Sequence, residues 1–172
     1  EGLYSGSETG VYLGHRRLAI LDPKDGAQPM WNEDATVAVC FNGEIYNHVA
    51  LRHELESRGH RFASDHSDTE VLVHGWEEWA EDLPLKLNGM FAFAIWDSKQ
   101  KVVFLARDRF GEKPLYWARQ NDTFLFASEL SAIAAHRKFN TRYDSLALKK
   151  YFAHGFIPSP NAAYCDTRKL PP

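Results

Sequence analysis

The chain has 172 residues, of which 44% are hydrophobic and 13% aromatic, so it is long enough to bury one sizeable core. Its net charge of -3, with both signs interspersed, gives no general attraction to nucleic acid or to an anionic membrane surface. No apolar stretch approaches the roughly 18 residues that span a bilayer, and no signal-peptide pattern is present, so we expect a cytoplasmic protein. The two cysteines, Cys40 and Cys165, form no CxxC pair, which argues against a disulfide scaffold or a zinc knuckle.

The first third of the chain predicts short strands. Strand patterns cover residues 11–13, 18–21 and 36–41, and the last run stops at the turn-forming pair Asn42-Gly43. This interpretation places Asn42 and Gly43 at the end of a strand.

Two helices are expected next. The first covers residues 47–58, with Asn47 as its N-cap, and the second covers residues 67–80. Ser67 and Glu70 match the capping-box pattern, in which the two side chains satisfy backbone N–H groups at a helix start. Asp68 would then lie in the first turn of the second helix.

The rest of the chain predicts an antiparallel meander followed by two helices. Phe91, Phe93 and Trp96 alternate near period two, as residues on a buried strand face do. Helices between two blocks of antiparallel strands favour an α+β layered fold with sheets packed face to face. The expected strands are residues 90–96, 102–106, 115–118 and 123–127, and the expected helices are residues 128–136 and 145–154.

Four residues in the first half of the chain have the chemistry to recognise an amino acid that carries a side-chain amide. Asn42 and Gly43 can supply two N–H donors to a tetrahedral oxyanion. Arg17 offers a planar fork for an α-carboxylate, and Asp68 offers a partner for an α-ammonium group. What such a pocket still needs is a nucleophile.

Several segments, in this order and spacing, resemble the glutaminase domain of glutamine-dependent asparagine synthetases. Members of that family are class II glutamine amidotransferases. The resemblance implies an α+β, N-terminal-nucleophile hydrolase-like four-layer sandwich with two antiparallel sheets between helix layers. The segments are Gly14 to Asp22, Phe41 to Asn47, Ser67 to Glu70, Gly89 to Ala94, Ala106 to Gly111 and Lys113 to Tyr116.

The resemblance also implies a role for each matching residue. Arg17 matches the arginine that holds the α-carboxylate of glutamine, with main-chain contacts from Leu18, Ala19, Ile20 and Leu21 beside it. Asn42 and Gly43 match the oxyanion hole, Glu44 belongs to the same glutamine-contacting turn, and Asp68 matches the carboxylate that pairs with the α-ammonium group.

In the family, the nucleophile is an N-terminal cysteine whose own α-amine handles the proton. This sequence starts at Glu1, and Cys40 lies inside an apolar strand, where a buried thiol is the ordinary interpretation. Cys165 lies in the tail with no base nearby in sequence. We therefore expect an amidotransferase domain at residues 1–156 that lacks its N-terminal segment and is inactive alone, and a Pro-rich connection at residues 157–172.

The expected function is hydrolysis of glutamine to glutamate and ammonia, for ATP-dependent amidation of aspartate on a second domain in asparagine biosynthesis. The expected partners are glutamine and a C-terminal synthetase domain, and an open sheet edge leaves room for a homodimer. No cofactor is expected for the glutaminase half, and ATP and magnesium only for the synthetase domain. Two alternatives stay open: a non-catalytic amino-acid-binding or structural module, or an amidotransferase with a different ammonia acceptor.

Other polar residues are expected to have structural roles. The eight histidines show no metal-ligand spacing, so no metal site is expected, and His15 and His74 are interpreted as packed or solvated. The Arg107-Asp108-Arg109 segment and Lys113 are interpreted as structural because nothing in the sequence ties them to glutamine.

Overall fold

The computed structural model describes residues 2–16 and 27–172, in two compact units that meet in sequence between Ala106 and Arg107. Both units combine helices with antiparallel strands, which confirms the expected α+β class. The strand predicted at residues 18–21 lies outside the described residues. None of the described helices has the length and apolar composition that a bilayer crossing requires.

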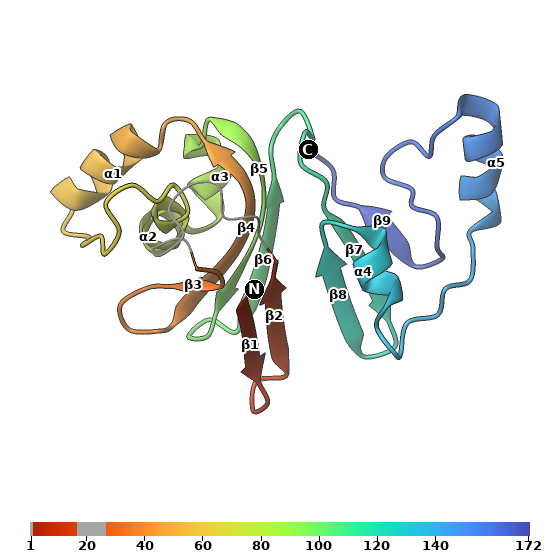
Figure 1. Cartoon of the computed structure of the whole chain (residues 1–172), viewed down its shortest axis with the longest axis horizontal. Coiled ribbons are helices and arrows are strands. Elements are labelled where there is room, and N and C mark those ends of the chain that lie inside the picture. Colours follow the sequence, from red (N-terminus) through yellow and green to blue (C-terminus); the bar gives the residue numbers. More distant parts are fainter. Residues whose placement is uncertain (1, 17–26) are drawn as a thin grey trace. The chain divides into compact units, whose positions relative to one another are not determined.

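The first unit contains a two-stranded sheet, a four-stranded sheet and three short helices (Figure 1). The four-stranded sheet has the order β3-β4-β5-β6, and β1 pairs with β2. Its elements are β1 (Gly2–Gly6), β2 (Val11–His15), β3 (Met30–Trp31), β4 (Val37–Ile45), α1 (His48–Ser57), α2 (Glu70–Trp79), a 3-10 turn (Ala80–Asp82), α3 (Leu83–Lys86), β5 (Gly89–Asp97) and β6 (Val102–Arg107).

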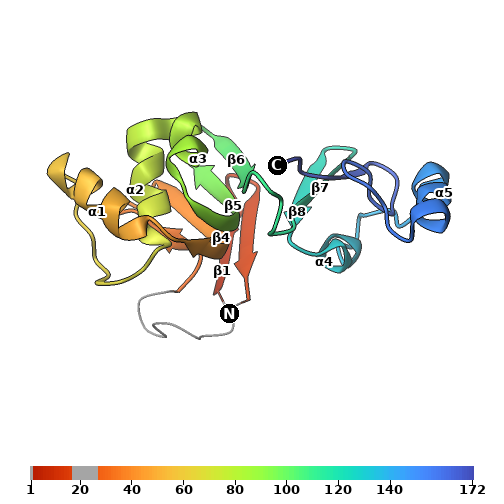
Figure 2. The same cartoon turned by 90° about the horizontal axis from the view of Figure 1, so that it is seen from above.

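The core of this unit lies between the sheet and the helices, which cover one face of it (Figure 2). Helix α1 contributes Leu51 and Leu55, which are four residues apart and therefore share a face. In α2 every residue from Glu70 to Trp76 is buried. The expectation that Phe91 and Phe93 of β5 belong to the core is confirmed.

Strand β4 is longer than the sequence predicts. It continues through Asn42 and Gly43 to Ile45, and β5 pairs with it over its whole length. The prediction of a turn at Asn42-Gly43 is therefore wrong. Glycine at this position instead allows β4 and β5 to approach each other closely. A Cβ atom on Gly43, whose φ is +151°, would lie 2.0 Å from the carbonyl oxygen of Met90.

The second unit has a three-stranded sheet of order β8-β7-β9 and two helices. The expected meander is therefore divided, because β5 and β6 belong to one sheet and β7 and β8 to another. The short strand β9, in the proline-containing tail, was not predicted. The elements are β7 (Tyr116–Gln120), β8 (Thr123–Ala127), α4 (Leu130–Ala134), α5 (Ser145–His154) and β9 (Thr167–Lys169).

Residues 108–115 connect β6 to β7 as an ordered loop. The guanidinium group of Arg107 donates to the carbonyl oxygens of Gly111, Lys113 and Leu170. The Asp108 carboxylate accepts from backbone N–H groups of this loop, including that of Lys113 at 3.0 Å. The structural interpretation of Arg107 and Asp108 is confirmed.

Both ends of α5 are capped. The Asp144 carboxylate accepts from the backbone N–H groups of Leu146 and Ala147, and Gly155 ends the helix with a φ of +77°. Asn47 is the N-cap residue of α1, as predicted, but its side chain makes no capping hydrogen bond and bonds the backbone of Lys86 and Asn88 instead.

Replacing Gly43 by alanine tests the close approach of β4 and β5. We expect Gly43→Ala to lower the free energy of unfolding by about 3 kcal/mol, since the added methyl group meets backbone that cannot move independently. Gly59→Ala is the matched control: Gly59 also has a positive φ, of +102°, but an added Cβ would meet nothing within 4 Å. That variant should lose only about 1 kcal/mol, and equal losses in urea unfolding would contradict the account.

Candidate functional site

Asn42 and Glu44 lie on the face of β4 that is turned away from the helices. Side chains alternate along a strand, and the alternating residues Phe41 and Ile45 are buried in the core beneath the helices. Asn42 is half-buried and Glu44 is exposed. The cross-strand partner of Asn42 is Ala92, whose small side chain leaves room for the amide group.

Asp68 is brought to this end of β4 from the segment before α2. Its Oδ2 atom accepts a hydrogen bond of 3.1 Å from the backbone N–H of Ile45. The helix itself begins at Glu70, so the prediction that Asp68 lies in its first turn is wrong by two residues. The structure thus joins two motifs, Asn42-Gly43-Glu44 and Asp68, that the sequence separates by more than twenty residues.

The electrostatics of Asp68 favour the binding of a cation. Burial raises the pKa of its carboxyl group, and the neighbouring Glu44 raises it further, against the lowering effects of the Ile45 N–H and of His48. When a carboxylate is desolvated and lies beside a second carboxylate, a positive group that binds nearby stabilises its ionised form. An α-ammonium group has the charge and the hydrogen-bond donors for this position.

His48 is a site residue that the sequence interpretation missed. It is the first residue of α1, and its Nδ1 atom lies 2.8 Å from the carbonyl oxygen of Ile45. It is close enough to Asp68 to lower the pKa of that carboxyl group. In the sequence, its only signal is its position directly after the Phe41 to Asn47 segment.

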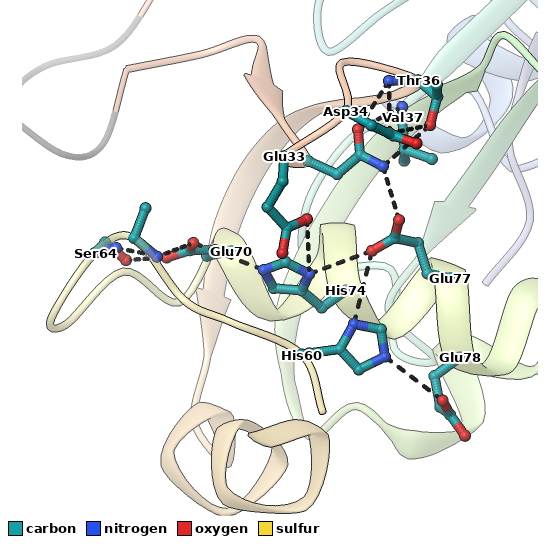
Figure 3. A network of polar contacts seen from close by, with 12 residues as sticks. Glu33, Asp34, Thr36, Val37, His60, Ser64, Glu70, His74, Glu77 and Glu78 are labelled. Atoms are coloured by element: carbon teal, nitrogen blue, oxygen red, sulfur yellow. Dashed lines mark hydrogen bonds and ion pairs between the residues drawn. The ribbon is translucent and has the colours of Figure 1, made fainter. Parts of the chain in front are cut away.

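The loop that carries Asp68 is held by Glu70 and Arg52. The Glu70 carboxylate accepts from the backbone N–H groups of Ala63, at 2.6 Å, and Ser64, at 2.9 Å (Figure 3). Arg52 donates to the carbonyl oxygens of Ser64 and Asp65. The capping-box prediction for Glu70 is therefore wrong, because the side chain orders this loop instead of the helix start.

The remaining predicted site residues fall in different places. Arg17 and the segment from Leu18 to Leu21 lie outside the described residues. Cys40 lies two residues before Asn42 on the same strand, and burial raises the pKa of its thiol to about 12. A thiol with that pKa is almost entirely protonated at neutral pH, so Cys40 is a poor nucleophile.

A family model and several known proteins match this chain in sequence. Residues 1–172 match a family model described as a glutamine amidotransferase domain. Over 152 residues the chain is 46% identical to asparagine synthetase [glutamine-hydrolyzing] 3 of Bacillus subtilis, covering 87% of this chain and 25% of that protein. It is 43% identical over 162 residues to asparagine synthetase [glutamine-hydrolyzing] 1 of the same organism, covering 94% and 25%. The chain thus spans about a quarter of the length of these two relatives.

A solved structure shares the fold. The glutamine phosphoribosylpyrophosphate amidotransferase of B. subtilis matches with a TM-score of 0.52 and 28% identity, over 62% of this chain and 25% of that one. The match supports the expected N-terminal-nucleophile type of α+β fold.

The raised pKa of Asp68 predicts a trade-off between stability and binding. Folding favours the protonated acid, so the ionised form costs stability, and this cost is complete at a pH above the folded-state pKa. We expect Asp68→Asn to unfold at the same or a higher temperature than the parent at pH 7, since the amide oxygen can still accept from Ile45. The same variant should lose calorimetric binding of L-glutamine.

Asp97→Asn is the control for this prediction. Burial alone would raise the pKa of Asp97, but hydrogen bonds from the Gln100 backbone and the Trp76 indole lower it. Its ionised form therefore stabilises the fold above the unfolded pKa, and the variant should unfold at a lower temperature at pH 7. A lower unfolding temperature for Asp68→Asn, as large as that of Asp97→Asn, would contradict the assignment.

Proposed function

This chain belongs to the glutamine amidotransferase domain family, and we propose that it hydrolyses the side-chain amide of glutamine within a longer asparagine synthetase. The ammonia released would then serve the amidation of aspartate in asparagine biosynthesis. The names of the two B. subtilis relatives support this assignment, as they describe glutamine-hydrolysing asparagine synthetases.

One observation carries the proposal: the carboxylate of Asp68 reaches the end of β4, the strand that also carries Asn42 and Gly43. The carboxylate is bonded to Ile45, three residues after Asn42, and is partly desolvated. An amino acid bound with its α-ammonium group at Asp68 would extend its side chain along this end of the strand. This arrangement supports recognition of glutamine as an amino acid instead of as a simple amide.

Asn42 and Gly43 would stabilise the charge that develops during attack on the amide carbon. Attack converts the amide oxygen into an oxyanion, and the side-chain amide of Asn42 with the backbone N–H of Gly43 would donate to it. Collapse of the tetrahedral intermediate releases ammonia and leaves a thioester, and water then hydrolyses the thioester to glutamate. Arg17 would hold the α-carboxylate in a bidentate contact.

The nucleophile proposed for this step is the N-terminal cysteine of the longer protein, as the family resemblance implies. Cys40 is excluded by its raised pKa. The Cys165 thiol belongs to the second unit, where it lies 3.5 Å from the carbonyl oxygen of Tyr143. The glutaminase half would need no cofactor, and ATP with magnesium would act in the synthetase domain.

An exposed aromatic surface on α5 supports a neighbouring domain as a partner. Tyr151 and Phe152 of the helix and Phe156 just after it are all exposed, and Phe152 is 81% accessible. Large exposed apolar side chains that lie together mark interaction surfaces. We propose that the synthetase domain packs here.

Asn42→Ala tests the oxyanion assignment. In the longer protein, we expect kcat for glutamate release to fall by about 100-fold or more, because loss of one oxyanion donor acts on the transition state. Cys40→Ala, on the same strand and face, should retain activity. If Asn42→Ala kept its kcat, or if Cys40→Ala lost it, the proposed chemistry would be wrong.

Arg17→Lys tests the α-carboxylate contact. We expect it to raise KM for L-glutamine about tenfold or more, since a lysine ammonium cannot form the two parallel hydrogen bonds of a guanidinium group. Arg16→Lys changes the adjacent arginine in the same way and should leave KM unaltered. Equal KM values in the two variants would remove Arg17 from the site.

A further inference from the structure

His60, His74 and Glu77 form a cluster of metal-ligand atoms away from Asn42 and Asp68. One ligand atom of each residue lies within 4.8 Å of those of the other two. His74 and Glu77 are one turn apart on α2, and His60 comes from the segment after α1 (Figure 3). The cluster therefore joins two segments of the fold.

The separations are close to those that a small cation requires. The Nδ1 atom of His74 lies 3.2 Å from Oε2 of Glu77, and the Nδ1 atom of His60 lies 3.7 Å from the same oxygen. Ligands of tetrahedral zinc lie about 2.0–2.1 Å from the metal, which places them roughly 3.3 Å from one another. Small side-chain shifts would bring all three atoms to bonding distance.

Glu33 offers a fourth ligand. Its Oε2 atom lies 3.9 Å from Nδ1 of His74, on the same side of the imidazole ring as Glu77. Glu33 is largely exposed, so it is free to approach. Two imidazole nitrogens and two carboxylate oxygens form a donor set that favours zinc over magnesium or calcium, which prefer oxygen alone.

The ring nitrogens that face away from Glu77 already have carboxylate partners in both histidines. The Nε2 atom of His74 lies 3.7 Å from Oε1 of Glu70, and the Nε2 atom of His60 lies 3.5 Å from Oε2 of Glu78. Histidines that bind metals almost always donate their other ring N–H to a carboxylate or carbonyl, which leaves the ligating nitrogen unprotonated. Both rings therefore have the orientation of metal ligands, with Nδ1 turned towards Glu77.

Glu77 is held in the same manner. Its Oε1 atom accepts a hydrogen bond of 2.7 Å from the side-chain amide of Asn32, which leaves Oε2 for the shared position between the histidines. Asn32 in turn accepts from the backbone N–H groups of Thr36 and Val37 through its side-chain oxygen. The ligand oxygen is thus positioned by the turn between β3 and β4.

The charge of the cluster also suits a dication. Four carboxylates, those of Glu33, Glu70, Glu77 and Glu78, surround two imidazole rings. Arg58 pairs with Glu78. A divalent cation would offset part of the negative charge of these four carboxylates.

We propose that His60, His74 and Glu77, with Glu33 as the fourth ligand, bind one zinc ion in a structural site. The ion would tie the loop between α1 and α2 to the body of α2 and to the β3–β4 turn. Because that loop also carries Asp68, the ion would restrain the candidate glutamine site without contacting the substrate.

The test is zinc binding by the tag-free chain after treatment with a chelator. Titration calorimetry with zinc chloride should give one site per chain, and zinc should raise the unfolding temperature while magnesium chloride does not. Cobalt(II) in place of zinc should give the visible absorption of a tetrahedral site. Absence of one-to-one binding, or a cobalt spectrum of purely octahedral type, would overturn the proposal.

Variants assign the binding to this cluster. His60→Gln and Glu33→Gln change partly accessible side chains and should each weaken zinc binding at least about tenfold. His53→Gln is the control, since His53 on α1 is largely exposed and lies outside the cluster. If His53→Gln weakened zinc binding as much as the other two, or if those two left it unaltered, the ion would bind elsewhere and the cluster would be only a proton-balanced ion network.

Discussion

The pairing of β4 with β5 is the constraint on which the rest of the first unit depends. Glycine at position 43 and glycine at position 89 let the two backbones approach where any Cβ would overlap a carbonyl oxygen. The continuous register then fixes which side chains face the helices and which face away. Asn42 is placed on the face opposite the helices by the same register that buries Ile45 in the core, so the fold and the candidate site have one common cause.

The candidate site stores an electrostatic cost in the protein without ligand. Asp68 is partly desolvated and lies near Glu44, and both effects make its ionised form unfavourable. The protein tolerates this because the surrounding loop is held firmly by Glu70 and Arg52. A bound ammonium group removes this electrostatic cost. Part of the binding free energy therefore comes from relief of an unfavourable charge that the protein already has without ligand.

Sequence patterns predicted most strands and helices of the chain, and the α+β class follows from them. The sequence patterns gave wrong predictions where the same residues commonly occur in two different local structures. Asn42-Gly43 is a frequent turn pair, but tertiary pairing with β5 extends the strand through it. Glu70 fits a capping box, but its carboxylate has better donors in the loop at Ala63 and Ser64. Such choices depend on partners far away in sequence.

The site residues could be predicted as a set because their chemistry is complementary. Their positions in space could not be predicted from the sequence. Nothing local in the sequence indicates that Asp68 reaches Ile45, or that His60 and His74 turn the same nitrogen to one glutamate. The division of the strand pairs into two sheets was also not predictable from local sequence, since β7 pairs with its second partner, β9, about fifty residues later.

The most direct test of the candidate glutamine site is the ¹⁵N–¹H spectrum of the labelled chain during titration with L-glutamine. We expect the Gly43, Ile45 and Asp68 amide resonances to shift with L-glutamine and not with D-glutamine. Shifts confined to other residues, or an unchanged spectrum at saturating ligand, would contradict it.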